Sequence, residues 1–459
     1  MHDFTNISEL EKKYSSPNDQ ENFVSLLDRT KLWSYFHRFA AVLAGRVGGA
    51  LSIFLVNLLL ARSLGAPALG TYAIYVSLVA ILSICLSLGF NSTASIFAAE
   101  YKTTGHNGLL KGYINTALKY VANSTLLLSS ALLVVWLFLP DILPPNFLLF
   151  AFLVILTAIG ASLLNLCSAV QVGLGRQVAG MLPETLLRPV LVGAVVFITI
   201  DSLHNIYWVM ALSAAATWIA LFSAYLACAK QLTENKSTSA QYDLKRWKKA
   251  SRPWLATSLL WDYMIDLVLL ITSLMAGAVE IAILHVCFRY RMLAGFGMRT
   301  IYLLLMPEIT SSNVMGETGR LRRKIAQTNS ASLFYSLAMI MFFTVFGEWL
   351  LTLFSLEFAN AVPVLIIISL TMVIRAVFGP ASLVLAVNNL NLATAAISLL
   401  GLLATIVMIV LFIGQFGLLA VAVAYSLSNL MVSVMLWIHA KNKTGIDSSI
   451  FALAKPAIA

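Results

Sequence analysis

The stretch FAAVLAGRVGGALSIFLVNLLLAR, residues 39–62, decides the fold of this chain. Apart from Arg46, Asn57 and Arg62, its residues are apolar or small, and they continue for about 20 positions, the length that an α-helix needs to cross the hydrocarbon core of a bilayer. Backbone polar groups find no water in lipid, so a spanning segment of this kind must be helical. The stretch therefore predicts a transmembrane helix.

Similar apolar runs follow along the rest of the chain. They lie near residues 71–98, 114–139, 147–172, 183–200, 206–229, 253–275, 281–306, 330–354, 361–387, 392–414 and 417–439. None shows the alternation of polar and apolar residues that a membrane β-barrel requires. We therefore predict an all-α, polytopic membrane protein with twelve transmembrane helices.

The composition supports a membrane protein and argues against nucleic-acid binding. Of the 459 residues, 60% are hydrophobic and only 11% are charged, against about 25% charged in soluble domains. The net charge is +10, but the basic residues gather at helix ends and in short loops, where anionic lipid headgroups lie. The four cysteines fall inside apolar runs without CxxC spacing, so we expect neither a disulfide nor a metal site.

The distribution of basic residues predicts the orientation. Of the 30 Lys and Arg residues, 23 fall in the two terminal segments or in loops on the same side of the membrane. The opposite loops hold only Arg62. Since loops rich in Lys and Arg stay in the cytoplasm, both termini are predicted to be cytoplasmic, with the protein in a bacterial inner membrane.

The longest internal polar stretch divides the predicted helices into two groups of six. We predict a cytoplasmic N-terminal segment, two six-helix bundles joined by a cytoplasmic linker, and a cytoplasmic tail, at residues 1–38, 39–229, 230–252, 253–440 and 441–459. Two bundles that start on the same side are expected to be related by an axis along the membrane normal and to enclose a central cavity.

Charged residues inside the predicted spans point to a functional site. A charge at the centre of a bilayer costs about 2.5–3.5 kcal/mol even on the mildest scale, so these side chains must face a cavity or a partner. Guanidinium groups bind phosphate in a bidentate manner and keep their charge. The candidate substrate-binding residues are Arg46, Arg289, Arg291 and Arg375.

Two carboxylates in the seventh predicted span are candidates for ion coupling. Asp262 and Asp266 are four residues apart, which places them on one helix face, where one carboxylate is expected to carry a proton or Na⁺. The alternative is structural, with Asp266 neutralising Arg289 and Asp262 neutralising Arg291. Arg289 and Arg291 lie on different faces of their helix, because each residue turns the helix by about 100°.

The sequence shows no signature of an enzyme. It contains no phosphate-binding loop, no Gly-x-Ser-x-Gly turn and no His-Glu-x-x-His zinc motif. A membrane-bound glycosyltransferase or ligase is disfavoured by the short outer loops. We therefore expect no catalytic residues, no metal and no cofactor, with coupling to H⁺ or Na⁺ left open.

Several short motifs resemble those of polysaccharide flippases, which export O-antigen or exopolysaccharide units. These flippases belong to a superfamily of exporters that also holds multidrug and toxin extrusion proteins. The motifs are LLARSLGAPALGTY at 59–72, SLGF at 87–90, PEITS at 307–311, Gly-Pro at 379–380, Asn-Asn at 388–389 and GLLAVAVAYS at 417–426. The resemblance covers residues 39–440. It implies a V-shaped cavity between two halves, a polyprenyl-pyrophosphate-linked saccharide as substrate, and cavity arginines at Arg46, Arg289 and Arg375.

Two functions are consistent with these features. The first is translocation of a lipid-linked oligosaccharide across the inner membrane by alternating access, for lipopolysaccharide or exopolysaccharide synthesis. Its expected partners are the lipid-linked oligosaccharide, membrane lipids and other polysaccharide assembly proteins. The alternative is a cation-coupled multidrug exporter of the same fold. The excess of intramembrane arginine favours the first.

Overall fold

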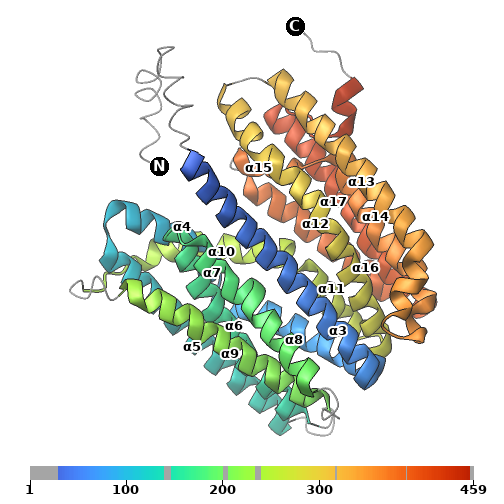
Figure 1. Ribbon diagram of the computed structural model, residues 1–459, viewed down its shortest axis with the longest axis horizontal. Helices are drawn as coiled ribbons and strands as arrows, with labels where there is room; N and C mark the ends of the chain where they lie inside the picture. Colours follow the sequence, from blue (N-terminus) through green and yellow to red (C-terminus); the bar gives the residue numbers. More distant parts are fainter. Residues whose placement is uncertain are drawn as a thin grey trace.

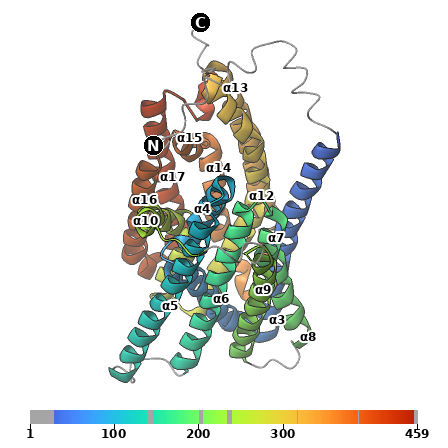
Figure 2. The ribbon, with the colours of Figure 1, turned by 90° about the vertical axis from the view of Figure 1, so that its left-hand side faces the viewer.

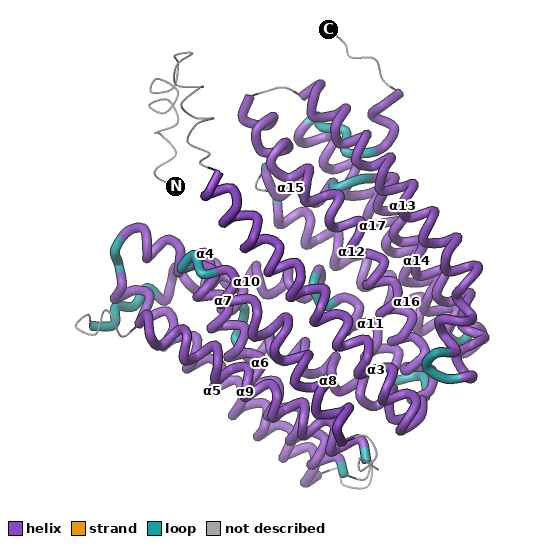
Figure 3. Tube along the Cα trace, viewed as in Figure 1, coloured by secondary structure: helices purple, strands orange, loops and turns teal. Residues whose placement is uncertain are grey.

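The computed structural model describes residues 29–138, 146–199, 205–232, 239–315, 318–388 and 390–454. Most of the predicted N-terminal segment and the last residues of the predicted tail lie outside these ranges. Helices joined by short loops make up the described chain, and no strand occurs within it (Figure 3). The predicted all-α fold class is therefore confirmed.

The helices in the first part of the chain are α3 (Arg29–Leu86), α4 (Phe90–Thr104), α5 (Asn107–Phe138), α6 (Phe147–Gly173), α7 (Gln177–Leu182), the π-helical turn η1 (Pro183–Leu187), α8 (Arg188–Thr199) and α9 (Ile206–Leu232). The second part holds α10 (Leu244–Trp261), α11 (Met264–Ser273), α12 (Ala278–Met315), α13 (Thr318–Thr352), η3 (Leu356–Ala361), α14 (Val362–Phe378), α15 (Ala381–Val387), α16 (Asn391–Phe416), α17 (Leu418–Thr444) and η4 (Ile450–Ala454).

The helix α3 contains the first predicted span and the first part of the second, which continues beyond a turn at residues 87–89 into α4. Its 58 residues would form a rod of roughly 87 Å at 1.5 Å per residue, far longer than a bilayer is thick. Gly65 breaks the rod with φ 82° and ψ 170°, a backbone conformation that favours glycine, and Pro67 follows it. The two predicted runs at 39–62 and 71–98 lie on either side of this kink.

The described helices account for all twelve predicted spans. Ten helices are long and apolar enough to cross a membrane, and the bent pair α10–α11 raises the number to eleven. This count treats the kinked α3 as one span. The kink at Gly65 separates the first predicted span from the second, which brings the total to twelve. The fifth predicted run, at 183–200, corresponds to η1 and α8, and α7 precedes them in the same span.

The helices form two groups that diverge toward the end of the molecule where α3 begins and α17 ends (Figures 1 and 2). In the first group α6 packs on α9 and on α3, and α8 packs on α9. In the second, α13 packs on α14, and α17 packs on α14 and α16. Helix α12 joins the two groups by packing on α3, so the core continues between them.

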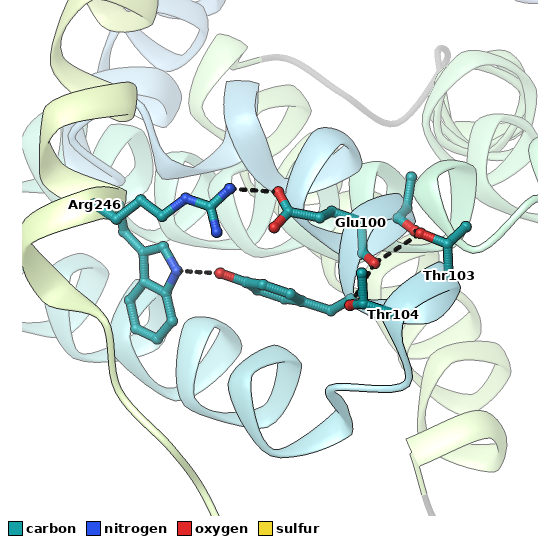
Figure 4. Close-up of polar contacts among 7 residues, drawn as sticks. Glu100, Thr103, Thr104 and Arg246 are labelled. Carbon is teal, nitrogen blue, oxygen red and sulfur yellow. Dashed lines mark hydrogen bonds and ion pairs between the residues drawn. The ribbon is translucent and has the colours of Figure 1, made fainter. Parts of the chain in front are cut away.

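The seventh predicted span is not one straight helix. It is divided into α10 and α11, which meet at an angle of 65°. Helix α10 begins within the predicted linker and lies against α4. Arg246 forms an ion pair with Glu100 at 2.8 Å, and the indole N–H of the fully buried Trp247 donates to the Tyr101 hydroxyl at 2.7 Å (Figure 4).

The chain after α17 folds back onto the break in the tenth span. Helix α17 ends at Thr444 and is capped by Gly445, and the residues from Ile446 to Ser449 are all buried. The Asp447 Oδ1 atom accepts hydrogen bonds from the Trp437 indole at 2.8 Å and from the Ser449 hydroxyl at 2.7 Å. Lys441 Nζ lies 3.5 Å from Asp447 Oδ2. Burial raises the pKa of Asp447, but these bonds and the charge of Lys441 outweigh it and leave the pKa below its usual value.

This carboxylate makes the folded protein sensitive to acid. Because its pKa is lowered on folding, its contribution to stability is fully present above the unfolded value of about 3.9 and is lost as the pH falls through the folded pKa. We expect Asp447→Asn to lower the melting temperature in detergent by about 2–4 °C at neutral pH, and by less near pH 3. The exposed Lys443→Gln is the control. An equal difference at both pH values would contradict the assignment.

Candidate functional site

A pocket of about 430 Å³ lies where the two groups of helices meet. Its walls come from α3, α6, η1, α8, α9, α11 and α12. We call it the central pocket. Its polar lining consists of Asn57, Tyr72, Tyr75, Ser83, Asn165, Glu184, Arg188, Ser213, Asp262, Tyr263, Asp266, His285 and Arg289. Three residues predicted from the sequence, Asp262, Asp266 and Arg289, therefore line one pocket.

Asp266 lies in the first turn of α11 and is hydrogen-bonded to α3. The Ser77 hydroxyl donates to Asp266 Oδ1 at 2.8 Å. Arg289 interacts electrostatically with Asp266 but forms no ion pair with it within 4.0 Å. The Arg289 Nε donates instead to His285 Nε2 at 3.3 Å, and a nitrogen that accepts carries no proton, so this contact requires a neutral imidazole. Direct neutralisation of Asp266 by Arg289 is therefore not seen.

Asp262 and Asp266 do not share one helix face, and the prediction that they do was wrong. Asp262 caps the end of α10, whereas Asp266 belongs to α11 beyond the bend of 65°. The i, i+4 rule holds only for a continuous helix. Asp262 is exposed and is attracted to Arg299, and it makes no ion pair with Arg291 within 4.0 Å. Both carboxylates nevertheless line the central pocket.

Four arginines outside this pocket form a second group, which we call the cationic cluster: Arg46, Arg291, Arg299 and Arg375. Arg375 is within electrostatic range of Arg291 and Arg299, and Arg299 is within range of Arg46. The first comes from α3, two come from α12 and the last from α14, so both halves of the chain contribute. Repulsion between like charges disfavours such a cluster unless an anion joins it.

The side chains of the cationic cluster are accessible. Arg46, Arg299 and Arg375 are exposed and Arg291 is half-buried. Arg291 is held by a hydrogen bond from its Nε to the Thr371 hydroxyl on α14, at 3.2 Å. Arg289 faces the central pocket, as the helical offset from Arg291 predicts. The structure thus divides the predicted arginines between two neighbouring sites.

The sequence interpretation left several residues of these sites unassigned. Arg299 lies in the same predicted span as Arg291, and the cost of its charge in lipid was the available signal. Glu184 and Arg188, which are four residues apart in the fifth predicted span, also line the central pocket. Glu184 lies in the π-helical turn η1, which begins at Pro183 and is followed by Arg188 and Pro189, and such turns are frequent at functional sites.

Comparison with known structures identifies the fold. The chain is similar to an inward-facing conformation of a multidrug resistance MATE family transporter of the MOP superfamily, with a TM-score of 0.70, 14% identity and coverage of 92% of this chain and 99% of that one. It is also similar to a mutant MATE transporter of Vibrio cholerae, with a TM-score of 0.60, 17% identity and coverage of 90% and 98%.

A third similar structure is a MOP superfamily transporter of Pyrococcus furiosus, described as having a binding pocket of reverse polarity that suggests a different function. Its TM-score is 0.60, with 15% identity and coverage of 91% and 96%. No protein-family model and no curated protein sequence matches the chain. The chain is therefore a multi-pass membrane protein with the MATE fold.

Proposed function

We propose that this protein translocates a polyprenyl-pyrophosphate-linked oligosaccharide across the bacterial inner membrane by alternating access. The observation that carries the proposal is the cationic cluster, in which exposed guanidinium groups from both halves lie within electrostatic range of one another. A pyrophosphate group carries about two to three negative charges at neutral pH and needs several charge-assisted donors when it leaves water. Arg46, Arg291 and Arg375 would bind it, with Arg289 extending the site toward the central pocket.

The central pocket supplies the coupling site in this proposal. It places Asp262 and Asp266 beside Arg289, so uptake of H⁺ or Na⁺ at a carboxylate changes the net charge next to the substrate site. A change in local charge during the cycle allows the phosphate to be bound on one side and released on the other. Membrane lipids and other polysaccharide assembly proteins are the expected partners.

A cation-coupled multidrug exporter is the second candidate. The fold is shared with multidrug MATE transporters, and the carboxylates of the central pocket, Glu184 included, are the groups that attract a cationic drug. The Pyrococcus furiosus structure with its pocket of reverse polarity supports the view that one fold hosts pockets of either charge. The position of the four arginines outside the carboxylate pocket favours the flippase.

A binding experiment separates the two candidates. Purified protein in detergent should bind a polyprenyl pyrophosphate more tightly than a cationic dye, and inorganic pyrophosphate should compete with the lipid. Arg46→Ala should weaken lipid binding by roughly tenfold, the loss of one hydrogen bond to a charged group. Arg62→Ala is the control, because Arg62 binds the Leu353 carbonyl outside the cluster. Tighter binding of the dye than of the lipid would favour the exporter.

The orientation gives an independent prediction. Lys249 in α10 and Glu357 in η3 are both exposed, and they are predicted to lie on opposite sides of the membrane. In a variant without the four native cysteines, Glu357→Cys should react with an impermeant maleimide on intact cells with a permeable outer membrane. Lys249→Cys should react only after the inner membrane is opened. The reverse pattern would contradict cytoplasmic termini.

A further inference from the structure

We propose that the C-terminal segment from Ile446 to Ser449 acts as a clasp that positions Arg375 for anion binding. The proposal rests on the proposed function, because it assigns Arg375 to the pyrophosphate site. The clasp contacts the backbone where the tenth span is interrupted between α14 and α15, one turn after Arg375. Ser448 and Asp447 are its positioning residues.

The interruption leaves backbone carbonyls that need donors. Helix α14 ends at Phe378, and Pro380 has no N–H with which to continue the hydrogen-bond ladder. The Arg375 carbonyl accepts from the Gly379 N–H at 2.9 Å. The Phe378 carbonyl accepts from the Ser448 hydroxyl at 3.0 Å. A side chain of the C-terminal segment thus supplies a donor that the helix itself lacks.

Close packing fixes the segment against the interruption. Gly379 has φ 70°, and a Cβ atom built there would collide with the Ser448 carbonyl and with the Asn329 side chain. The buried Asn329 donates to that carbonyl from Nδ2 at 2.7 Å. The Tyr302 hydroxyl lies 3.2 Å from Asn329 Oδ1 and 3.4 Å from the Arg375 carbonyl. Hydrogen-bonding groups therefore link Ser448 through α13 and α12 to the backbone of Arg375.

Asp447 anchors the clasp to α17. Its Oδ1 atom accepts from Trp437 and Ser449, and Lys441 lies above the Trp437 ring at 5.1 Å. The same Trp437 ring packs against Phe378, with ring centroids 5.7 Å apart. Loss of the clasp would free the last turn of α14. Because the Arg375 guanidinium extends from that turn, a small tilt of the turn would move it away from the cluster.

Two measurements on the full chain in detergent test the clasp. In Ser448→Ala, amide hydrogen exchange in residues 376–385 should be faster than in wild type, and inorganic pyrophosphate should bind about tenfold more weakly. The control Lys443→Ala, at an exposed position in the last turn of α17, should change neither. In an Arg375→Ala background, Ser448→Ala should have no further effect on pyrophosphate affinity, because the effect of the clasp passes through Arg375.

Two results in Ser448→Ala would show that the C-terminal segment does not position Arg375. Unchanged exchange in Ser448→Ala, or an equal loss of affinity with and without Arg375, would overturn the clasp. Should Ser448→Ala fail to fold, Asp447→Asn provides the same comparison, because it weakens the anchor by removing the charge that Lys441 pairs with, while keeping an acceptor for Trp437. Unchanged pyrophosphate affinity in Arg375→Ala alone would contradict the proposed function. The hydrogen exchange of Ser448→Ala would then be the remaining test of whether the clasp holds the end of α14.

Discussion

Replacing Arg375 with alanine is expected to abolish export of surface glycan in cells that depend on this protein. Arg375 is exposed and lies within electrostatic range of Arg291 and Arg299, and in the proposed site its removal leaves the pyrophosphate short of a donor. The expected loss is about ten- to a hundredfold in affinity for the lipid-linked substrate. Arg375→Lys should restore export only in part, because lysine keeps the charge but loses the planar fork.

Export should be measured by surface-glycan labelling at matched protein levels. Arg62→Ala serves as the control, since it removes an exposed arginine that is bonded to the Leu353 carbonyl. Full export by both Arg375→Ala and Arg46→Ala would contradict the assignment of the cationic cluster. If Arg375→Ala and Arg46→Ala instead made the cells lose resistance to a cationic dye, the result would favour the exporter.

Replacing Asp266 with asparagine is expected to uncouple transport from the ion gradient. The Ser77 hydroxyl can still donate to the amide oxygen, so the fold should be kept while the titratable charge is lost. In proteoliposomes, transport driven by a proton or Na⁺ gradient should fall to the rate measured without the gradient. Asp262→Asn tests the second carboxylate, and Asp243→Asn at the start of α10 is the control outside the pocket. Normal gradient-driven transport in both pocket variants would make the carboxylates structural.

Hydropathy and charge predicted most of the fold because lipid imposes strict rules on helices. The run at 39–62 and the eleven runs after it correspond to helices or broken helices of the structure. The gap between the first two runs, at 63–70, contains the Gly65 kink. The same rules say nothing about where a span bends. The 65° break next to Asp262 lies at the end of α10, and α10 packs on α4, which is far away in the sequence.

The site was predictable to the extent that charge in lipid is costly. That cost made Arg46, Arg291 and Arg375 candidates, but it did not reveal that they lie within electrostatic range of one another through Arg299. The contacts between Asn329 and Ser448 join residues 119 positions apart, and periodicity carries no signal for such pairs. The predicted tail was therefore assigned no role, although its first residues are buried against the tenth span.

The fastening of α10 to α4 has a practical consequence for dividing the protein. A chain cut between Leu232 and Ser239 yields two fragments, each with half of the spans. The second fragment keeps Arg246 and Trp247, and the first keeps their partners Glu100 and Tyr101. The contacts between α10 and α4 would then form an interface between two separately synthesised fragments. A cut placed after Arg252 would instead leave both partners of these contacts in the first fragment, and the second fragment would lack Arg246 and Trp247.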